Sequence, residues 1–356
     1  MRQKALFICA HYPDASATQA GHKIAQHNLN ELRQHYNVDT VFILRDAQCQ
    51  YPPSEPDDRP TAIIQSIGLR RILAVGAGML AGLPPRFATR YSVEAKRQIR
   101  ELMRMHTYTI VWLEFSQVFW LAPSVARHGA SGSTLTLSAH DVQVELLQRK
   151  SMPERLLLLR WTRWCEGRFF RLADSIRVLS EKDRNLVQSY NPKAPITVSP
   201  PRPSAFATSV RRLPGSIQPH SLLFWGAMNR SENYAAVIGF IEKHLPQLVR
   251  EFADATLFVV GANPPKRVRE LASTHVIVTG FVVDPTPYFE KASLGVVPLI
   301  QGAGVKLKTL EMLAAGLTVI STEIGAEGIA PSPRLVVTPL QDIVTEISRR
   351  WRVAPM

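Results

Sequence analysis

The segment that decides the fold runs from Gln301 to Gly328 and reads QGAGVKLKTLEMLAAGLTVISTEIGAEG. Its residue types predict a glycine-rich loop, a helix that begins near Val305, a buried strand and a second glycine loop. Gly302 and Gly304 allow the backbone to approach a ligand closely, and the free N–H groups at the start of a helix attract anions. We therefore expect this segment to bind a phosphate-bearing ligand.

Three charged residues of the predicted helix support the same expectation. Lys306 and Lys308 lie near the positive end of the helix dipole, where lysines are unfavourable unless an anion compensates them. Glu311 follows one turn later, and a lone carboxylate can accept hydrogen bonds from a ribose or sugar hydroxyl. The leucines of this helix are expected on its buried side, at Leu307, Leu310 and Leu313. A surface helix with solvated lysines is the alternative interpretation.

The chain has 356 residues, a length at which about two domains are expected. Its hydrophobic fraction of 46% is typical of a globular protein. We find no signal-peptide pattern and no apolar run of the roughly 20 residues that a membrane-spanning helix needs. The cysteines are widely spaced and form no CxxC pair, which favours a reducing cytosol and gives no indication of structural zinc. They are Cys9, Cys49 and Cys165.

The formal net charge of +13 is distributed unevenly along the chain. Residues 1–212 contain 29 Lys and Arg against 17 Asp and Glu, a net charge of +12, whereas residues 213–356 contain 13 against 12. This asymmetry indicates an anionic partner for the first half, either a membrane leaflet or a polyanion.

Short β-rich runs alternate with helical patterns along both halves of the chain. This alternation predicts parallel sheets with crossover helices, so each half should form a doubly wound α/β domain. We expect an N-terminal domain over residues 1–200, a proline-rich linker over 201–219, a C-terminal domain over 220–340 and a final helix over 341–356 that packs back toward the N-terminal domain. The predicted strands are Ala5–Ala10, Asp39–Leu44, Thr109–Phe115, Thr134–Ser138 and Ser175–Leu179, then Leu222–Trp225, Thr256–Gly261, His275–Val278, Leu294–Pro298 and Thr318–Ser321.

In this order of elements the chain resembles glycosyltransferase family 4. The similarity is strongest from Gly304 to Gly316, where GVKLKTLEMLAAG resembles the family pattern GTRLKxLEAMAxG. The resemblance implies a GT-B architecture, in which two Rossmann-like doubly wound parallel-sheet domains face each other across a cleft that holds the site. Supporting segments are FWGAMN at 224–229, VVGA at 259–262, TEIGAEG at 322–328, SAHD at 138–141 and RLADS at 171–175.

The resemblance also implies a reaction. Members of the family transfer a sugar from a nucleotide diphosphate-sugar to an acceptor hydroxyl with retention of configuration, and no metal is obligatory. By resemblance, Lys306, Lys308 and the backbone of Gly302–Gly304 would hold the phosphates, and Glu311 would bind the nucleotide ribose. His140 would contact the donor sugar or the acceptor. A strand-end histidine that is satisfied by a local backbone carbonyl is the alternative for His140.

The C-terminal half departs from the family pattern in its charged residues. The first carboxylate of the family's Glu-x7-Glu pair falls at Ala303. The usual Arg and Lys of the first loop fall at Ala227 and Asn233. Arg230, close to the donor-side Gly226, is the candidate replacement for one of these charges, and an exposed loop arginine is the alternative.

Two glycine motifs of the first half need separate interpretation. The family's glycine pair is reduced to Gly21, which can let a helix start approach the phosphate or serve as a helix N-cap. Val75–Gly82 matches the dinucleotide fingerprint GxGxxG, but Pro84 would truncate the helix that this fingerprint requires. A small-residue helix or loop is the better interpretation of Val75–Gly82.

Between Pro153 and Ala173, arginines alternate with tryptophan, phenylalanine and leucine. Interfacial helices use aromatic rings at the headgroup level and guanidinium groups on lipid phosphates. A core-packing helix with a solvated basic face is the alternative. The charge of the same half favours peripheral association with an anionic membrane, where a lipid-linked acceptor would be found.

We therefore expect a cytoplasmic glycosyltransferase, peripheral on the inner face of the cytoplasmic membrane, that uses a nucleotide diphosphate-sugar and extends a glycan or lipid-linked acceptor in polysaccharide or glycoconjugate biosynthesis. No cofactor and no metal are expected. A non-catalytic GT-B module that acts as a partner subunit would explain Ala303 and the reduced loop at Gly21. A nucleic-acid-binding protein would explain the charge, but no matching motif accompanies it, so no nucleic-acid partner is expected. An isomerase of the same architecture is a further alternative.

Overall fold

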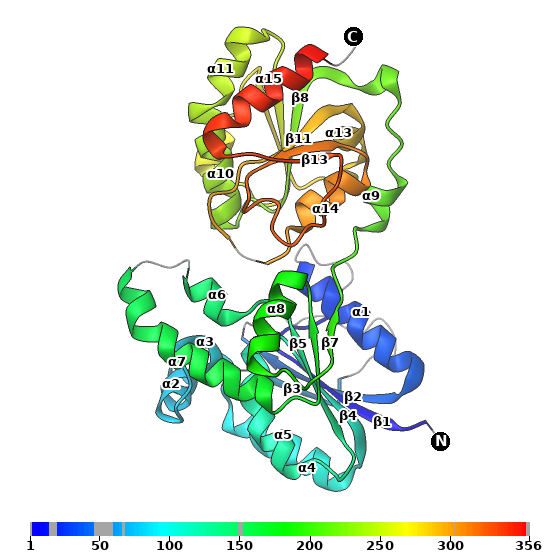
Figure 1. Cartoon of the computed structure of the whole chain (residues 1–356), viewed down its shortest axis with the longest axis vertical. Coiled ribbons are helices and arrows are strands. Elements are labelled where there is room, and N and C mark those ends of the chain that lie inside the picture. Colours follow the sequence, from blue (N-terminus) through cyan, green and yellow to red (C-terminus); the bar gives the residue numbers. More distant parts are fainter. Residues whose placement is uncertain are drawn as a thin grey trace. The chain divides into compact units, whose positions relative to one another are not determined.

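The computed structural model describes residues 2–13, 20–45, 60–65, 68–148, 152–302 and 304–353, without the side chains of residues 20 and 152–157. The chain divides into two compact units, Met1–Pro200 and Pro201–Met356. Each unit is built on one sheet with helices packed around it (Figure 1). Neighbouring strands in the described parts of both sheets run parallel, as the alternating pattern predicts.

The N-terminal unit contains a seven-stranded sheet in the order β3-β2-β1-β4-β5-β6-β7. The order reverses between β1 and β4, because the chain first builds outward from β1 to β3 and then continues on the other side of β1. Strand β1 is buried from Ala5 to Cys9, as expected where helices cover both faces of a parallel sheet. The strands are β1 Lys4–Cys9, β2 Asn37–Leu44, β3 Ala62–Gln65, β4 Tyr108–Glu114, β5 Thr134–Ala139, β6 Ser175–Val178 and β7 Ile196–Val198.

The longest described helix of this unit is α7, which lies beside α6 and α8 (Figure 1). Its Phe169 and Phe170 are buried in the core while Arg163, Trp164 and Arg168 are exposed, so this part of α7 is a core-packing helix with a basic face. The interfacial interpretation of its phenylalanines is therefore wrong. The helices are α1 Ala20–His35, α2 Leu69–Leu80, α3 Pro85–Ala88, α4 Val93–Met105, η2 Ser116–Leu121, α5 Ala122–His128, α6 Gln143–Gln148, α7 Met152–Arg171 and α8 Glu181–Tyr190.

The C-terminal unit repeats this plan with a six-stranded sheet in the order β10-β9-β8-β11-β12-β13. Here the order reverses between β8 and β11. The strands are β8 Gln218–Trp225, β9 Thr256–Val260, β10 Val276–Gly280, β11 Ala292–Val297, β12 Thr318–Ser321 and β13 Leu335–Val337. The helices are α9 Ala205–Ser209, η3 Pro214–Ser216, α10 Ser231–Lys243, α11 Leu245–Glu251, α12 Lys266–Glu270, α13 Thr286–Lys291, α14 Leu307–Ala314, η4 Leu340–Asp342 and α15 Ile343–Val353.

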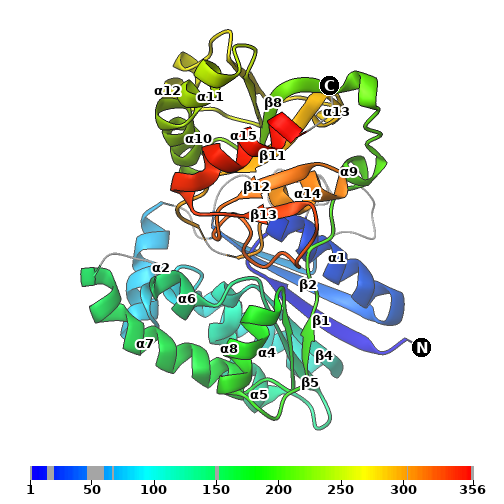
Figure 2. The ribbon, with the colours of Figure 1, turned by 45° about the horizontal axis from the view of Figure 1, so that its top comes forward.

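Residues 201–219 contain α9 and η3 and make specific contacts within the C-terminal unit. Helix α9 lies beside α14, and Figure 2 shows the two together. Arg212 donates hydrogen bonds to the carbonyl oxygens of Phe289 at 3.2 Å and Gly316 at 3.0 Å. The ring of Phe206 packs edge-on against Trp225 and Phe289. This segment therefore supplies packing as well as a connection.

All ten predicted strands are present, with ends that differ by a few residues. Three further strands, β3, β7 and β13, have only three or four residues each and lie at sheet edges. Short edge strands bury little apolar surface, so their sequences carry little periodic pattern.

Gly76 and Gly78 of the dinucleotide-like motif lie inside α2, and Gly82 follows its end, so the motif does not lie ahead of a helix. A Cβ on Gly78 would lie 2.9 Å from the Cβ atoms of Ala88 and Tyr91. Gly78 therefore allows α2 to approach α3 closely, which confirms the interpretation of this motif as a small-residue helix.

Candidate functional site

The strand-order reversal of the C-terminal sheet brings two glycine loops to one edge. Gly226 follows β8, and the loop that contains Gly302 follows β11, which is paired with β8. Their φ angles of 150° and 118° lie in a region that favours glycine. Open α/β sheets bind ligands outside the carboxyl ends of their strands at such a reversal. The two predicted donor-side loops therefore occupy the position where a ligand is expected.

Lys308 extends from α14 to the loop after β8. Its Nζ donates a hydrogen bond to Oδ1 of Asn233, and the Asn233 amide donates to the carbonyl oxygen of Ala227 at 2.6 Å. A Cβ on Gly226 would lie 3.2 Å from Cε of Lys308, so the glycine leaves room for this side chain. Burial and the neighbouring Arg230 lower the pKa of Lys308 to about 7. An anion bound at this edge would favour the charged ammonium.

Lys306 lies between the glycine loop that precedes α14 and the glycine loop that follows β12. Its Nζ donates to the carbonyl oxygen of Gly304 at 2.6 Å and lies 3.4 Å from Oε2 of Glu327. Its backbone N–H donates to the carbonyl oxygen of Glu327 at 3.3 Å. Helix α14 begins at Leu307, two residues after the predicted start near Val305.

Arg230 lies beside a carboxylate that the sequence analysis did not consider. Nε of Arg230 is 2.6 Å from Oε1 of Glu232. A Cβ on Gly302 would lie 3.7 Å from Cγ of Glu232, so this carboxylate is close to the loop after β11. Glu232 therefore partly compensates the positive charge of Arg230 and Lys308 when no ligand is bound.

Glu311 is only 4% exposed, and both of its carboxylate oxygens accept hydrogen bonds from the protein. Oγ of Ser204 donates to Oε1 at 2.7 Å, and Nε1 of Trp225 donates to Oε2 at 2.6 Å. The buried residues of α14 are Thr309, Glu311 and Met312, whereas its leucines are half-buried, so the predicted buried face is wrong. Since each carboxylate oxygen has two lone pairs, Glu311 can accept a further hydrogen bond from a ligand.

The N-terminal unit carries His140 directly after β5, close to the end of β4. Nε2 of His140 donates a hydrogen bond to Oε1 of Glu114. The fully buried Glu114 also accepts from Nε1 of Trp112 and, at 3.0 Å, from Nδ2 of Asn28. Arg177 donates to Oδ1 of Asn28 at 3.0 Å. The partner of His140 is thus a buried carboxylate, and the alternative of a backbone carbonyl partner is wrong.

Gly21 lies against the same histidine ring. A Cβ at Gly21 would be 2.9 Å from Cε1 of Phe115 and 3.5 Å from Nδ1 of His140. The Phe115 and His140 rings lie 3.9 Å apart between centroids. Nδ1 of His140 is buried and has no hydrogen-bond partner in the part of the chain that the structure describes. Since Nε2 donates to Glu114, Nδ1 is the ring nitrogen that can form a hydrogen bond with a ligand beside the start of α1.

A second histidine, His11, follows β1 at the same edge. Its ring centroid lies 4.8 Å from that of Phe115 and 5.0 Å from that of His22. Nη2 of Arg90 is 3.4 Å from Nδ1 of His11 and donates to it. Burial and the Arg90 charge lower the pKa of His11 to about 3, so His11 is neutral at neutral pH.

The sequence analysis missed Glu114, Glu232 and Arg90 as parts of these clusters. Glu114 had a usable signal, because it is a charged residue next to the end of the predicted strand Thr109–Phe115. Glu232 and Arg90 had none, because their roles depend on which segments pack together. Ala303, where the family's first carboxylate would fall, lies outside the described residues.

The described residues contain no group of three or more His, Cys, Asp or Glu side chains that could hold a metal ion. Among the helices that the structure describes, none has the length and apolar character needed to cross a bilayer.

The fold is shared with known structures over almost the whole chain. Sucrose-phosphate synthase from Thermosynechococcus elongatus has a TM-score of 0.68 and 15% identity, over 99% of this chain and 90% of that one. Anabaena HepE in complex with UDP has a TM-score of 0.62 and 13% identity, over 98% and 89%. WaaG, a glycosyltransferase involved in lipopolysaccharide biosynthesis, has a TM-score of 0.57 and 16% identity, over 98% and 90%. The two parallel sheets and these neighbours define a GT-B fold, which confirms the predicted fold class.

Within the C-terminal unit the sequence is also similar to a family model. Residues 219–350 match the family model described as Glycosyl transferases group 1. An uncharacterized 44.6 kDa protein in the cps region of Klebsiella pneumoniae is 27% identical over 117 residues, and the match spans only 30% of that protein's length and 30% of this chain. The family match and the GT-B fold together support a glycosyltransferase.

Proposed function

We propose that the chain is a retaining GT-B glycosyltransferase of the family 4 type that transfers a sugar from a nucleotide diphosphate-sugar to a hydroxyl of a glycan or lipid-linked acceptor. The observation that carries the proposal is the position of Lys308 at the reversal of β8 and β11, within the residues that match the glycosyltransferase family model. UDP is present in the structure of the similar Anabaena protein, which supports a nucleotide diphosphate as the donor's leaving group.

The donor diphosphate is assigned to the loops at the edge of the C-terminal sheet. Lys306, Lys308 and Arg230 supply positive charge, and the backbone of Gly302 and Gly304 allows close approach. Positive groups at this place stabilise the charge that develops on the departing diphosphate, which is the main chemical requirement of the reaction. Because these side chains supply that charge, the proposal includes neither a metal nor a cofactor.

The remaining residues are assigned to the sugar, the ribose and the acceptor. Glu311 binds the nucleotide ribose through its free lone pairs and at the same time accepts the hydrogen bond from Nε1 of Trp225. His140 forms a hydrogen bond through Nδ1 with a hydroxyl of the donor sugar or the acceptor, and Glu114 positions its ring. Gly21 lets the start of α1 approach the phosphate.

The net charge of +12 on residues 1–212 favours a peripheral location on the inner face of the cytoplasmic membrane, because the lipids of that leaflet are anionic. The proposed pathway is polysaccharide or glycoconjugate biosynthesis.

The proposal is tested by a thermal-shift screen of nucleotide sugars followed by a nucleotide-release assay. A bound donor raises the melting temperature by mass action, and slow hydrolysis releases nucleotide. Lys308→Ala should abolish both responses, whereas Lys266→Ala, which removes an exposed lysine of α12, should keep them. If no nucleotide sugar raises the melting temperature, the donor assignment is wrong. Binding without any release would favour a non-catalytic partner subunit.

A further inference from the structure

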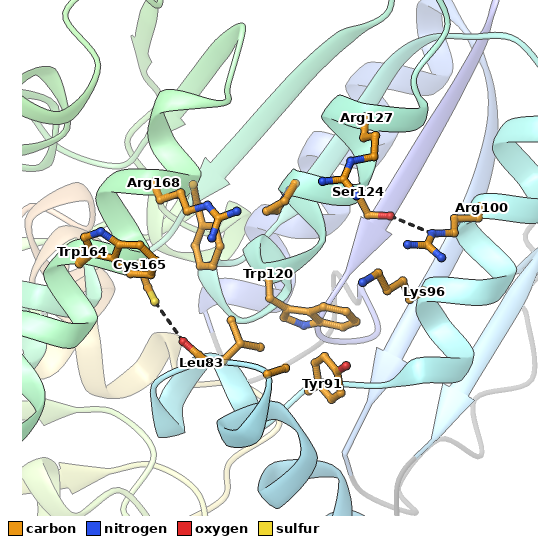
Figure 3. Close-up of a pocket in the computed structure, with 14 residues that line it drawn as sticks. Leu83, Tyr91, Lys96, Arg100, Trp120, Ser124, Arg127, Trp164, Cys165 and Arg168 are labelled. Atoms are coloured by element: carbon orange, nitrogen blue, oxygen red, sulfur yellow. Dashed lines mark hydrogen bonds between the residues drawn. The ribbon is translucent and has the colours of Figure 1, made fainter.

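The N-terminal unit contains a cavity of about 310 Å³ whose lining residues do not include His140 or Gly21. It lies among helices, and Figure 3 shows its basic side chains on both sides of Trp120. The lining includes four cations and no carboxylate. The cations are Lys96, Arg100, Arg127 and Arg168.

These positive charges have little compensation inside the protein. Nε of Arg100 donates to Oγ of Ser124 at 3.3 Å, and the Arg168 guanidinium lies 5.7 Å from the centroid of the Trp164 ring. No described carboxylate forms an ion pair with any of the four cations. Trp120 is 6% exposed, and its indole N–H has no hydrogen-bond partner among the described residues, which is uncommon for a buried donor. A cavity with this lining favours an anion.

Helix α2 leads into the cavity and exposes an apolar stripe. Leu69, Ile72, Leu73 and Leu80 recur at helical spacing and are 71%, 68%, 64% and 92% exposed. The opposite side of α2 carries Gly78, which packs against α3. A helix of a globular protein normally buries its apolar stripe, so this reversed orientation marks an interaction surface.

The stripe and the cavity are connected in the chain. Ala81, Gly82 and Leu83 continue directly from α2 and line the cavity. Trp164, at 59% exposure, also lines it, and Trp161 of the same helix donates from Nε1 to the carbonyl oxygen of Gly82 at 3.0 Å. An exposed tryptophan beside cations is typical of a membrane interface.

We propose that α2 and this cavity form a docking surface for an anionic phospholipid. The lipid phosphate binds the four cations, and the apolar stripe of α2 enters the interfacial region of the leaflet. A soluble phosphate ester would explain the cations but would leave the apolar stripe of α2 in water. The surface is separate from the donor-binding loops of the C-terminal unit, so the inference holds or fails independently of the donor assignment.

The experiment is co-sedimentation of the full chain with phosphatidylcholine vesicles that contain or lack phosphatidylglycerol. The cavity variant is Lys96→Gln with Arg127→Gln. Its matched control is Arg97→Gln with Arg104→Gln, which removes two exposed charges from α4 outside the cavity. The apolar variant is Ile72→Gln with Leu73→Gln. All changed side chains are at least partly exposed, and the melting temperature of each variant without ligand reports that the fold is intact.

We expect the wild-type chain to bind only the anionic vesicles. The cavity variant should lose about thirtyfold in partitioning, since it removes two cations that contact the lipid phosphate. The control should lose much less, because its two charges lie outside the cavity. The apolar variant should also lose binding. Equal losses in the cavity variant and its control would mean that only general charge attraction operates, and would overturn the proposal. A melting shift with soluble glycerol phosphate but no vesicle binding would overturn the lipid assignment in favour of a soluble phosphate ester.

Discussion

His140 donates a hydrogen bond from Nε2 to the fully buried carboxylate of Glu114, which lies at the end of the neighbouring strand β4. This contact fixes the orientation of the ring and leaves Nδ1 as the nitrogen that can contact a ligand. Nδ1 is also the atom that lies beside Gly21. Glu114 is therefore a positioning residue for the one histidine whose role the family resemblance implies.

Replacing Glu114 with glutamine should separate catalysis from donor binding. The glutamine amide cannot accept from His140, Trp112 and Asn28 together without presenting its NH2 group to one of these donors, so the ring should turn or change tautomer. We expect kcat to fall by about a hundredfold, as for small misplacements of a reacting group, with the donor KM little changed. Initial rates over a range of donor concentrations measure both constants.

The matched control for that experiment is Asp39→Asn, on β2 of the same sheet. Asp39 accepts a hydrogen bond from the Tyr108 hydroxyl at 2.6 Å, so the control also neutralises a bonded carboxylate. Its kcat should stay near the wild-type value. If both variants lose kcat equally, the loss reflects the sheet and not the orientation of His140.

The unusual pKa of Lys308 predicts a pH dependence of stability and of binding. In the folded chain this pKa is about 7, against an ordinary value of 10.5. Between these values the unfolded chain binds a proton that the folded chain lacks, so the contribution of Lys308 makes the free energy of unfolding rise with pH across this window. Urea unfolding at several pH values should show this rise in the wild-type chain and a weaker one in Lys308→Met.

Binding of a nucleoside diphosphate should show the opposite trend. The bound phosphates favour the charged ammonium, so binding above pH 7 takes up a proton and the affinity decreases as pH rises, by up to about tenfold per pH unit. Calorimetry with UDP in buffers of different ionisation enthalpy measures the proton uptake. Proton uptake that is unchanged in Lys308→Met would show that another group is responsible.

The sequence predicts that the donor-side glycines and His140 lie at the carboxyl ends of strands, because each of them follows a recognisable strand. The partners of the functional side chains could not be predicted. Lys308 is bonded to Asn233, 75 residues away, and Glu311 to Ser204, 107 residues away in a segment that has no apolar period. Such pairs depend on how the segments pack together, which local pattern does not encode. The contact of Lys306 with Glu327, 21 residues away, was hidden for the same reason.

A close backbone contact after β9 predicts a strict requirement for glycine. A Cβ on Gly261 would lie 1.9 Å from the carbonyl oxygen of Gly226, whose own N–H donates to the carbonyl oxygen of Val260 at 3.0 Å. Gly261→Ala must therefore displace the loop that faces Lys308, and we expect it to lower the free energy of unfolding by about 3 kcal/mol. The matched control, Gly239→Ala in α10, meets no atom within 4 Å and should stabilise the chain by up to about 1 kcal/mol. Urea unfolding compares them, and similar effects of both changes would contradict the contact.

Glu311 combines a structural contact with the proposed ribose contact, and substitutions can separate the two. Glu311→Ala leaves the indole N–H of Trp225 without its acceptor, so it should lower the free energy of unfolding by about 1–3 kcal/mol as well as weaken donor binding. Glu311→Gln can still accept from Trp225 and can donate to the Ser204 hydroxyl, so its melting temperature should stay close to the wild-type value.

The glutamine variant therefore tests the ribose contact. We expect about tenfold weaker UDP binding by calorimetry, since a hydrogen bond to a charged acceptor is replaced by one to a neutral amide. Ser204→Ala serves as the control, because it removes a hydrogen bond from the same carboxylate and keeps its charge. If Glu311→Gln binds UDP as tightly as the wild-type chain while the nucleotide still protects the protein against heat, Glu311 only anchors Trp225 and α9, and the ribose is bound elsewhere.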